Sequence, residues 1–108
     1  MNKIGPSLDA LTTRIKTRRY EDPSISYTAK LIGEGRLKCA KKLGEEGVEA
    51  ALAGAAGDRT ELIAESADVL YHLAVLLEAN DLSFDDVAQE LDRRAGLSGI
   101  AEKASRKS

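Results

Sequence analysis

The chain has 108 residues, 31% of them charged and 43% hydrophobic, and a formal net charge of −2. These values predict one folded, water-soluble domain and exclude both intrinsic disorder and a general affinity for nucleic acid. A single cysteine, Cys39, excludes an intramolecular disulfide, and with one histidine, His72, a zinc site of thiolates and imidazoles is not expected. The longest apolar run, 69–77, is too short to span a bilayer, and without a secretory signal pattern a cytoplasmic location is expected.

The N-terminal third of the sequence predicts two helices separated by a loop. Apolar residues recur at helical spacing behind Ser7, a suitable N-cap, and predict a helix that ends near Arg18. The segment 21–26 contains a proline and is predicted to be a loop. A short helix is expected over 27–32, because glycines follow at positions 33 and 35.

Two long helices are predicted in the middle of the chain. The first runs from about residue 36 to 53 and the second from 59 to about 79, with a glycine-containing turn at 54–57. Asp58, followed three residues later by Glu61, has the form of a capping box. The second long helix is therefore expected to begin directly after Asp58.

Two features of these long helices indicate that another helix or a ligand packs against them. Gly44 and Gly47 lie inside the first helix, where glycine is unfavourable, and suggest a close approach by another helix or a ligand. The second half of the other helix, 69–77, is apolar almost all round and should be buried on several sides. In so small a domain, this pattern predicts a helical partner from a second copy of the chain.

A last helix is predicted from a cap at Ser83 to about Arg94, with Val87 and Leu91 facing inward. Alternating strand patterns are absent from the sequence. The chain is therefore predicted to be all-α, a bundle of four to five helices that is completed by packing in a homodimer.

The domain is expected to comprise residues 1–94, followed by a basic C-terminal tail over 95–108. From residue 93 onward the sequence carries five basic residues against one acidic residue. Such a terminus is either a loose, solvated end or a flexible basic segment that closes over a phosphorylated substrate.

Two short acidic pairs are the strongest chemical signal in the sequence: Glu46-x-x-Glu49 and, after fifteen intervening residues, Glu65-x-x-Asp68. A three-residue step on a helix places both carboxylates of a pair on nearly one face. Two such helices side by side would bring the four carboxylates together, although like charges about 4 Å apart repel by roughly 4 kcal/mol at an effective dielectric near 20. Oxygen-only ligation of this kind suits Mg²⁺. The alternative is that both pairs are ordinary solvated helix faces.

The basic residues near the first acidic pair also allow two interpretations. Lys38, Lys42, Glu45 and Glu49 share one stripe of the helix. The lysines either form weak exposed ion pairs with the glutamates or bind phosphates that a metal does not neutralise. His72 lies on the same face as Glu65 and Asp68, and either orients a ligand or contacts substrate, or is a hydrogen-bonded core histidine. Without a phosphate loop or a nucleophile motif, the expected chemistry is metal-assisted.

The spacing of the two acidic pairs on an all-helical chain resembles the MazG-like all-α NTP pyrophosphohydrolases. Within that superfamily, longer segments resemble the phosphoribosyl-ATP pyrophosphatase family, and the similarity extends over about residues 8–106. The segments are Ser26-Tyr-Thr-Ala-Lys-Leu31, Lys41-Lys-Leu-Gly-Glu-Glu-Gly-Val-Glu49, Glu65-Ser-Ala-Asp-Val-Leu-Tyr-His72 and Ser98-Gly-Ile-Ala-Glu-Lys-Ala-Ser-Arg106.

The resemblance implies hydrolysis of phosphoribosyl-ATP to phosphoribosyl-AMP and pyrophosphate, an early step of histidine biosynthesis, by a homodimer. It implies that the two acidic pairs hold Mg²⁺ and that Glu45 is a further ligand or the base that activates water. The substrate-binding residues it implies are Tyr27, Thr28, Lys30, Lys38, Lys42 and His72, and the metal ligands are Glu46, Glu49, Glu65 and Asp68.

Two other functions remain open at the level of the sequence. A housekeeping pyrophosphatase for dNTPs or damaged nucleotides would use the same acidic residues, although the Ser-Tyr-Thr and Leu-Tyr-His segments favour the histidine-pathway enzyme. A helical interaction module with merely solvated acidic faces would need no metal. Release of pyrophosphate that depends on Mg²⁺ separates the enzymes from the module.

Overall fold

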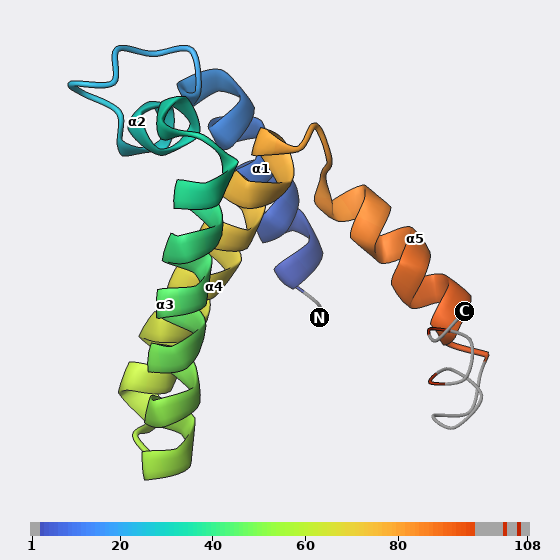
Figure 1. Ribbon diagram of the computed structural model, residues 1–108. Helices are drawn as coiled ribbons and strands as arrows, with labels where there is room; N and C mark the ends of the chain where they lie inside the picture. Colours follow the sequence, from blue (N-terminus) through green and yellow to red (C-terminus); the bar gives the residue numbers. More distant parts are fainter. Residues whose placement is uncertain (1–2, 97–102, 104–105, 107–108) are drawn as a thin grey trace.

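The computed structural model describes residues 3–96, 103 and 106, and these residues contain no strand. The predicted all-α class is thus confirmed (Figure 1). Most of the predicted basic tail, 95–108, lies outside the described residues. The helices are α1 (Ile4–Arg18), α2 (Tyr27–Glu34), α3 (Arg36–Ala56), α4 (Arg59–Ala79) and α5 (Phe84–Arg94).

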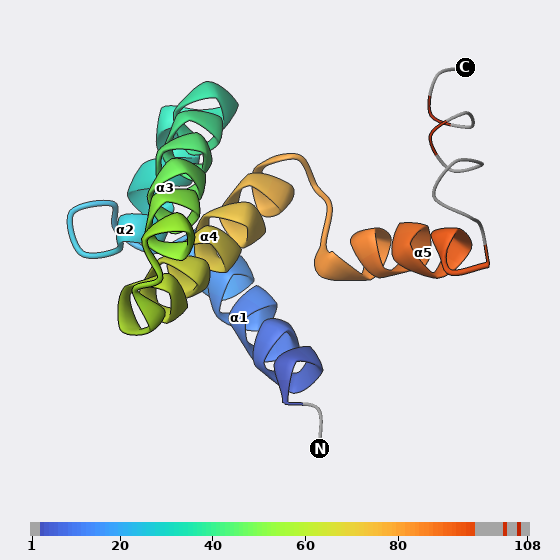
Figure 2. The same ribbon diagram turned by 90° about the horizontal axis from the view of Figure 1, so that it is seen from below.

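The two long helices, α3 and α4, run antiparallel and pack side by side as a hairpin (Figures 1 and 2). The turn is shorter than the predicted 54–57, because α3 continues to Ala56. Gly57 follows with a φ of 74°, and the amide of Asp58 donates to the carbonyl of Ala53 at 3.1 Å. This pattern ends the helix with a residue in the left-handed backbone conformation, which only glycine adopts at low cost. The Asp58 side chain then accepts from the amide of Glu61 and caps α4 as predicted.

Helix α1 begins at Ile4, four residues earlier than the helix predicted from a Ser7 cap. Ser7 is already helical, and its amide donates to the carbonyl of Lys3 at 3.1 Å. Pro6 lies in the first turn, where the backbone amides have no helical partner, so its missing N–H removes no hydrogen bond. The serine was therefore a wrong marker for the start of this helix.

The hydrophobic core lies at one end of the hairpin, where α1, α2 and the second half of α4 meet the start of α3. Its fully buried members are Ile15, Leu31, Cys39, Ala74 and Val75. Cys39 is a small core residue, and its thiol donates to the carbonyl of Leu31 at 3.3 Å. Ser26 caps α2 by accepting from the amide of Ala29 at 3.1 Å.

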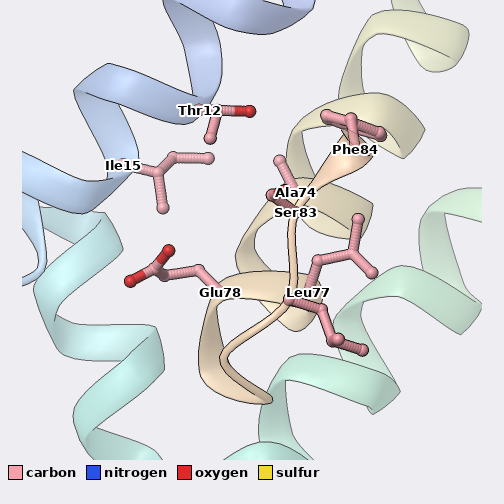
Figure 3. Close-up of a pocket in the computed structure, with 8 residues that line it drawn as sticks. Thr12, Ile15, Ala74, Leu77, Glu78, Ser83 and Phe84 are labelled. Atoms are coloured by element: carbon pink, nitrogen blue, oxygen red, sulfur yellow. The ribbon is translucent and has the colours of Figure 1, made fainter. Parts of the chain in front are cut away.

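A buried carboxylate ties α1 to the end of α4. Glu78 reaches from α4 toward α1, beside Ile15 (Figure 3). Lys16 donates to Glu78 at 2.9 Å and Arg19 donates to its other oxygen at 2.5 Å. Burial alone would raise the pKa of Glu78, but the hydrogen bonds from Arg19 and Lys16 outweigh burial and lower it. The pair of cations thus keeps this buried group ionised.

Helix α5 begins at the predicted Ser83 cap, and the structure adds a capping box in which Ser83 and Asp86 hold each other's backbone amides. The helix projects away from the hairpin in both views (Figures 1 and 2). The prediction that Leu91 faces inward is wrong, because its side chain is 61% exposed. Val87 is half-buried.

The outer half of the hairpin leaves several large apolar side chains exposed: Val48 and Leu52 on α3, and Ile63 on α4; Leu37, at the start of α3, is also exposed. Residues 69–77 are covered as expected, since none of their large apolar side chains is exposed, but other helices of the described chain contribute to that cover. A Cβ placed on Gly44 or Gly47 would meet nothing within 4 Å, so the predicted close approach at these glycines is not made within the described chain. No helix in the described ranges has the length and apolarity needed to cross a bilayer.

Candidate active site

Three carboxylates converge between the two long helices: Glu46 and Glu49 of α3, and Glu65 of α4. One oxygen of each lies within 4.8 Å of the others. The three-residue step within α3 turns its glutamates to one side, and the antiparallel course of α4 brings Glu65 opposite them. Glu46 and Glu65 are half-buried, whereas Glu49 is exposed. The cluster lies along the part of the hairpin that α1 and α2 leave open.

Glu65 has the most unfavourable position of the cluster. Its Oε2 is buried and has no hydrogen-bond partner within the described chain. The neighbouring Glu61 carboxyl raises the pKa of Glu65 to about 8, and burial, Glu46 and Glu49 act in the same direction. Glu61 lies one turn before Glu65 and was not predicted as a site residue. The Glu61-x-x-x-Glu65 spacing in the sequence was the available signal.

Asp68, the fourth predicted ligand, is not part of the three-carboxylate group. It is exposed and lines a cavity of about 470 Å³ between α1 and α4, together with Arg14 and Tyr71. Its charge acts on His72. The structure therefore brings three of the four predicted carboxylates together and places the fourth one turn further along α4.

The acidic cluster fits a hard divalent cation. Its ligand atoms are all carboxylate oxygens, and the repulsion that raises the pKa of Glu65 would be relieved by a positive ion. The buried, unpartnered Oε2 of Glu65 is an acceptor that such an ion would satisfy. The described residues thus offer an oxygen-rich site between two helices.

Beside the cluster, the side chains of Tyr27, Tyr71 and His72 form an aromatic group. The ring centres of Tyr71 and His72 are 5.0 Å apart, and Tyr27 lies 6.3 Å from Tyr71 and 6.1 Å from His72. Thr28 is buried, and its hydroxyl is 2.6 Å from that of Tyr71. The hydroxyl of Tyr71 thus has a hydrogen-bond partner within the described chain. This group joins α2 to the second half of α4.

His72 is buried, and its Nδ1 has no hydrogen-bond partner in the part of the chain that the structure describes. Burial lowers the pKa of His72, while the charges of Glu46 and Asp68 act in the opposite direction. Two roles were predicted for His72: a residue that orients a ligand or contacts substrate, and a hydrogen-bonded core histidine. The buried ring fits the second role, but its Nδ1 has no hydrogen-bond partner within the described chain.

The predicted phosphate-binding lysines lie at the edge of the acidic cluster. Lys42 forms an ion pair with Glu45 at 3.7 Å, three residues later on α3, and both side chains are partly exposed to solvent. Lys38 is half-buried on α3 and Lys30 is exposed on α2. Such solvated contacts contribute little stability. Their charges are thus available to a ligand.

The fold and the site together define an all-helical protein in which an antiparallel helix pair carries a cluster of carboxylates that could bind a cation. The family profile of phosphoribosyl-ATP pyrophosphohydrolases matches residues 8–95. The chain is 55% identical to the phosphoribosyl-ATP pyrophosphatase of Rhodobacter capsulatus over 93% of this chain and 97% of that relative. It is also 55% identical to the corresponding enzyme of Paracoccus denitrificans, over 93% of each chain. The chain therefore belongs to the phosphoribosyl-ATP pyrophosphohydrolase family.

Proposed function

We propose that Mg²⁺, held by Glu46, Glu49 and Glu65, serves the hydrolysis that defines the family. The chain is a phosphoribosyl-ATP diphosphatase of histidine biosynthesis, which forms phosphoribosyl-AMP and pyrophosphate. The observation that carries the proposal is the convergence of the three carboxylates within 4.8 Å, with a buried oxygen that lacks a partner. Asp68 joins as a fourth ligand from the next turn of α4.

The residues of the cluster would orient the reacting phosphates and the attacking water. Bound Mg²⁺ supplies charge neutralisation at the phosphoryl oxygens and lowers the pKa of bound water. Water would add to the α- or the β-phosphorus, and the bridging P–O bond would break. The group that takes the bridging oxygen and its electron pair would be pyrophosphate for attack at the α-phosphorus and phosphoribosyl-AMP for attack at the β-phosphorus. Glu45, exposed beside Glu46, is either a further ligand or the base that takes the proton from water.

The remaining predicted residues would bind the nucleotide around this centre. Lys38 and Lys42 would neutralise phosphate charge that the metal leaves, because both lie on α3 one or two turns from Glu46. Lys30 would do the same from α2. The rings of Tyr27 and His72 would contact the base or sugar, and Thr28 would hold Tyr71 in place beside them.

A homodimer is the assembly that the exposed surface supports. The radius of gyration is 15.7 Å, whereas a compact chain of this length would have about 13 Å. The exposed apolar side chains of Val48, Leu52 and Ile63 lie on the same hairpin as the acidic cluster. Packing of a second copy there would bury them and would exclude water from one side of the site. We place this enzyme in the cytoplasm, because its multiply charged nucleotide substrate does not cross membranes unaided.

The test is the variant Glu49→Gln, with Glu34→Gln as the matched control on an exposed position of α2. Glu49→Gln should lower kcat by at least about 10²-fold, the effect of losing one strong electrostatic contact to the transition state. Its thermal stability without Mg²⁺ should hold or rise, because one repelling charge is lost. Added Mg²⁺ should stabilise the wild type more than the variant. Normal Mg²⁺-dependent turnover by Glu49→Gln would remove this residue from the metal site.

The substrate assignment is tested by comparing phosphoribosyl-ATP with a panel of dNTPs. The expected result is pyrophosphate release from phosphoribosyl-ATP with a kcat/KM well above that for every dNTP. A preference for any dNTP would identify a housekeeping nucleotide pyrophosphatase instead. Absence of pyrophosphate release from all of them, with and without Mg²⁺, would favour a non-catalytic helical module.

A further inference from the structure

A groove between α1, α2 and α4 lies beside the three-carboxylate group and shares no residue with it. Tyr71 lines all of its parts, which are cavities of about 470, 330 and 390 Å³ along the face of α4. Volumes of about 300–1,000 Å³ are usual for small-molecule sites. The groove begins at Asp68, passes Arg14 and Arg18 of α1, and reaches Tyr27 of α2. It therefore connects the acidic end of the site to the aromatic group.

Arg14 and Arg18 both line the middle cavity of this groove. They are four residues apart on α1 and thus stand one turn apart on the same face. Neither forms an ion pair with any other described residue. The acidic residues that line the neighbouring cavities are Asp68 at one end and Glu21 at the other. Two unpaired guanidinium groups above a shared cavity form a site for an anion.

The other polar groups of the middle cavity are the hydroxyls of Thr28 and Tyr71, which are 2.6 Å apart. Because one hydroxyl donates to the other, one O–H proton of the pair remains and can be donated into the cavity. The rest of the lining is apolar, from Leu11 and Ile15. A phosphate monoester carries close to two charges at neutral pH, so it would match two arginines and one hydroxyl donor.

We propose that Arg14 and Arg18 bind the terminal phosphate of the phosphoribosyl group, which distinguishes phosphoribosyl-ATP from ATP. This inference rests on the proposed function, in which the acidic cluster binds the triphosphate. Tyr71 lies six residues after Glu65 on α4, or about 9 Å along the helix. The reacting phosphates and the arginine pair would thus contact different parts of one extended nucleotide, and the aromatic group lies next to the arginine pair along the groove. Arg14 and Arg18 are specificity residues here and do not touch the bond that breaks.

The experiment measures binding of the product without turnover. Titration calorimetry with phosphoribosyl-AMP and with AMP, both in the presence of EDTA, isolates the contribution of the phosphoribosyl group. For the wild type we expect phosphoribosyl-AMP to bind at least about tenfold more tightly than AMP, as charge-assisted hydrogen bonds allow. Arg14→Gln/Arg18→Gln should lose most of this difference and keep the affinity for AMP. Arg14→Lys/Arg18→Lys should keep part of the difference.

Arg59→Gln is the control, because it removes the same charge from the exposed start of α4. It should bind both nucleotides as the wild type does. In steady-state kinetics with Mg²⁺, the double glutamine variant should show a raised KM for phosphoribosyl-ATP with kcat within about twofold, since the lost contact is equal in ground and transition states. Melting curves and light scattering establish that fold and assembly are unchanged.

The proposal is overturned if the double variant retains the wild-type preference for phosphoribosyl-AMP, or if it weakens AMP and phosphoribosyl-AMP equally. It is also overturned if either the glutamine or the lysine variant changes the oligomeric state, which would make this groove an interface between copies of the chain. These outcomes do not depend on the metal site. A Glu49→Gln enzyme with normal activity would refute the metal proposal and leave the binding result standing.

Discussion

Glu65 shows at the level of one residue how the acidic site holds groups that repel one another. Its carboxyl has a pKa of about 8, against an ordinary value of 4.5, chiefly because of Glu61. Below that pH the metal-free protein carries a proton that relieves the repulsion. A divalent cation needs the ionised ligand, so the cation and the proton compete for the same oxygen atoms. The side chain therefore couples metal binding to pH.

We expect the affinity for Mg²⁺ to increase with pH and to level off above about pH 8. Below that pH the rise should be up to about tenfold per unit, because binding must displace one proton from Glu65. The sign for folding is opposite: the raised pKa means that Glu65 makes the metal-free protein less stable as the pH rises from 4.5 through about 8. Calorimetric Mg²⁺ titrations at several pH values measure the first effect, and melting curves in EDTA measure the second.

Glu65→Gln is the control for both measurements. It should bind Mg²⁺ weakly, with little pH dependence between pH 6 and 9, and its melting temperature in EDTA should not fall over that range as that of the wild type does. A wild-type affinity for Mg²⁺ that is constant from pH 6 to 9 would show that Glu65 is not protonated in the metal-free enzyme.

At the level of secondary structure, Glu78 fixes α1 against the end of α4 through Lys16 and Arg19. The two cations differ in exposure, since the Lys16 side chain is 56% exposed and that of Arg19 is 22% exposed. Lys16→Met should lower the free energy of unfolding by less than about 1 kcal/mol, as for a solvated ion pair. Arg19→Met should lower it by about 2–3 kcal/mol, because it removes a charged hydrogen bond and leaves Glu78 buried with one partner. Urea unfolding of both variants gives the comparison.

The pH dependence of these variants identifies the cause. Because the pKa of Glu78 is lowered in the fold, its contribution is present above the ordinary carboxyl pKa and is lost as the pH falls through the lowered value. The stability difference between wild type and Arg19→Met should therefore shrink in acid. If Lys16→Met and Arg19→Met lose the same free energy of unfolding at neutral pH, side-chain exposure does not determine how much each cation contributes.

The sequence predicted helices best where a local cap marks their ends. Asp58 and Ser83 bond backbone amides within a few residues, so the starts of α4 and α5 were predicted correctly. The sequence was less informative where packing decides. The periodicity of α5 shows that Leu91 lies on an apolar stripe, but does not show that nothing in the chain covers that stripe. The spacing of Asp68 fixes its face on α4, but not which face of α3 lies opposite.

At the level of the whole molecule, the α3–α4 hairpin exposes apolar surface that a second copy would cover. Leu52→Glu, at a side chain 65% exposed, should convert the proposed dimer into monomers, because a buried charge without a partner is costly. Ile25→Glu, on the exposed loop before α2, is the control and should remain dimeric. Light scattering at micromolar concentration measures the mass. A stable, fully active wild-type monomer would refute the dimer.

The basic C-terminal segment gives a second prediction at this level. Arg93 and Arg94 are both bound to Glu90, at 2.7 and 2.9 Å, so they serve α5 and the positive charge left for a ligand comes from later residues. Deleting 98–108 should raise KM or lower kcat/KM several-fold and weaken the dependence on salt, because basic residues that would neutralise a polyphosphate are lost. The melting temperature should change little. If the enzyme without 98–108 keeps its full kcat/KM at low and moderate ionic strength, the segment has no role in substrate binding or turnover.

The tight Gly57 turn has a consequence for how the chain folds. Because α3 and α4 are adjacent in sequence, their pairing is a local contact and belongs to the early events of folding. The converging glutamates lie on this same hairpin, fewer than twenty residues apart in the chain. The repulsion among these glutamates must therefore be overcome before the folding transition state is reached, when the rest of the core cannot yet offset it. A divalent cation, or a proton on Glu65, would then accelerate folding as well as slow unfolding, and the enzyme would reach its native state fastest where its metal is already present.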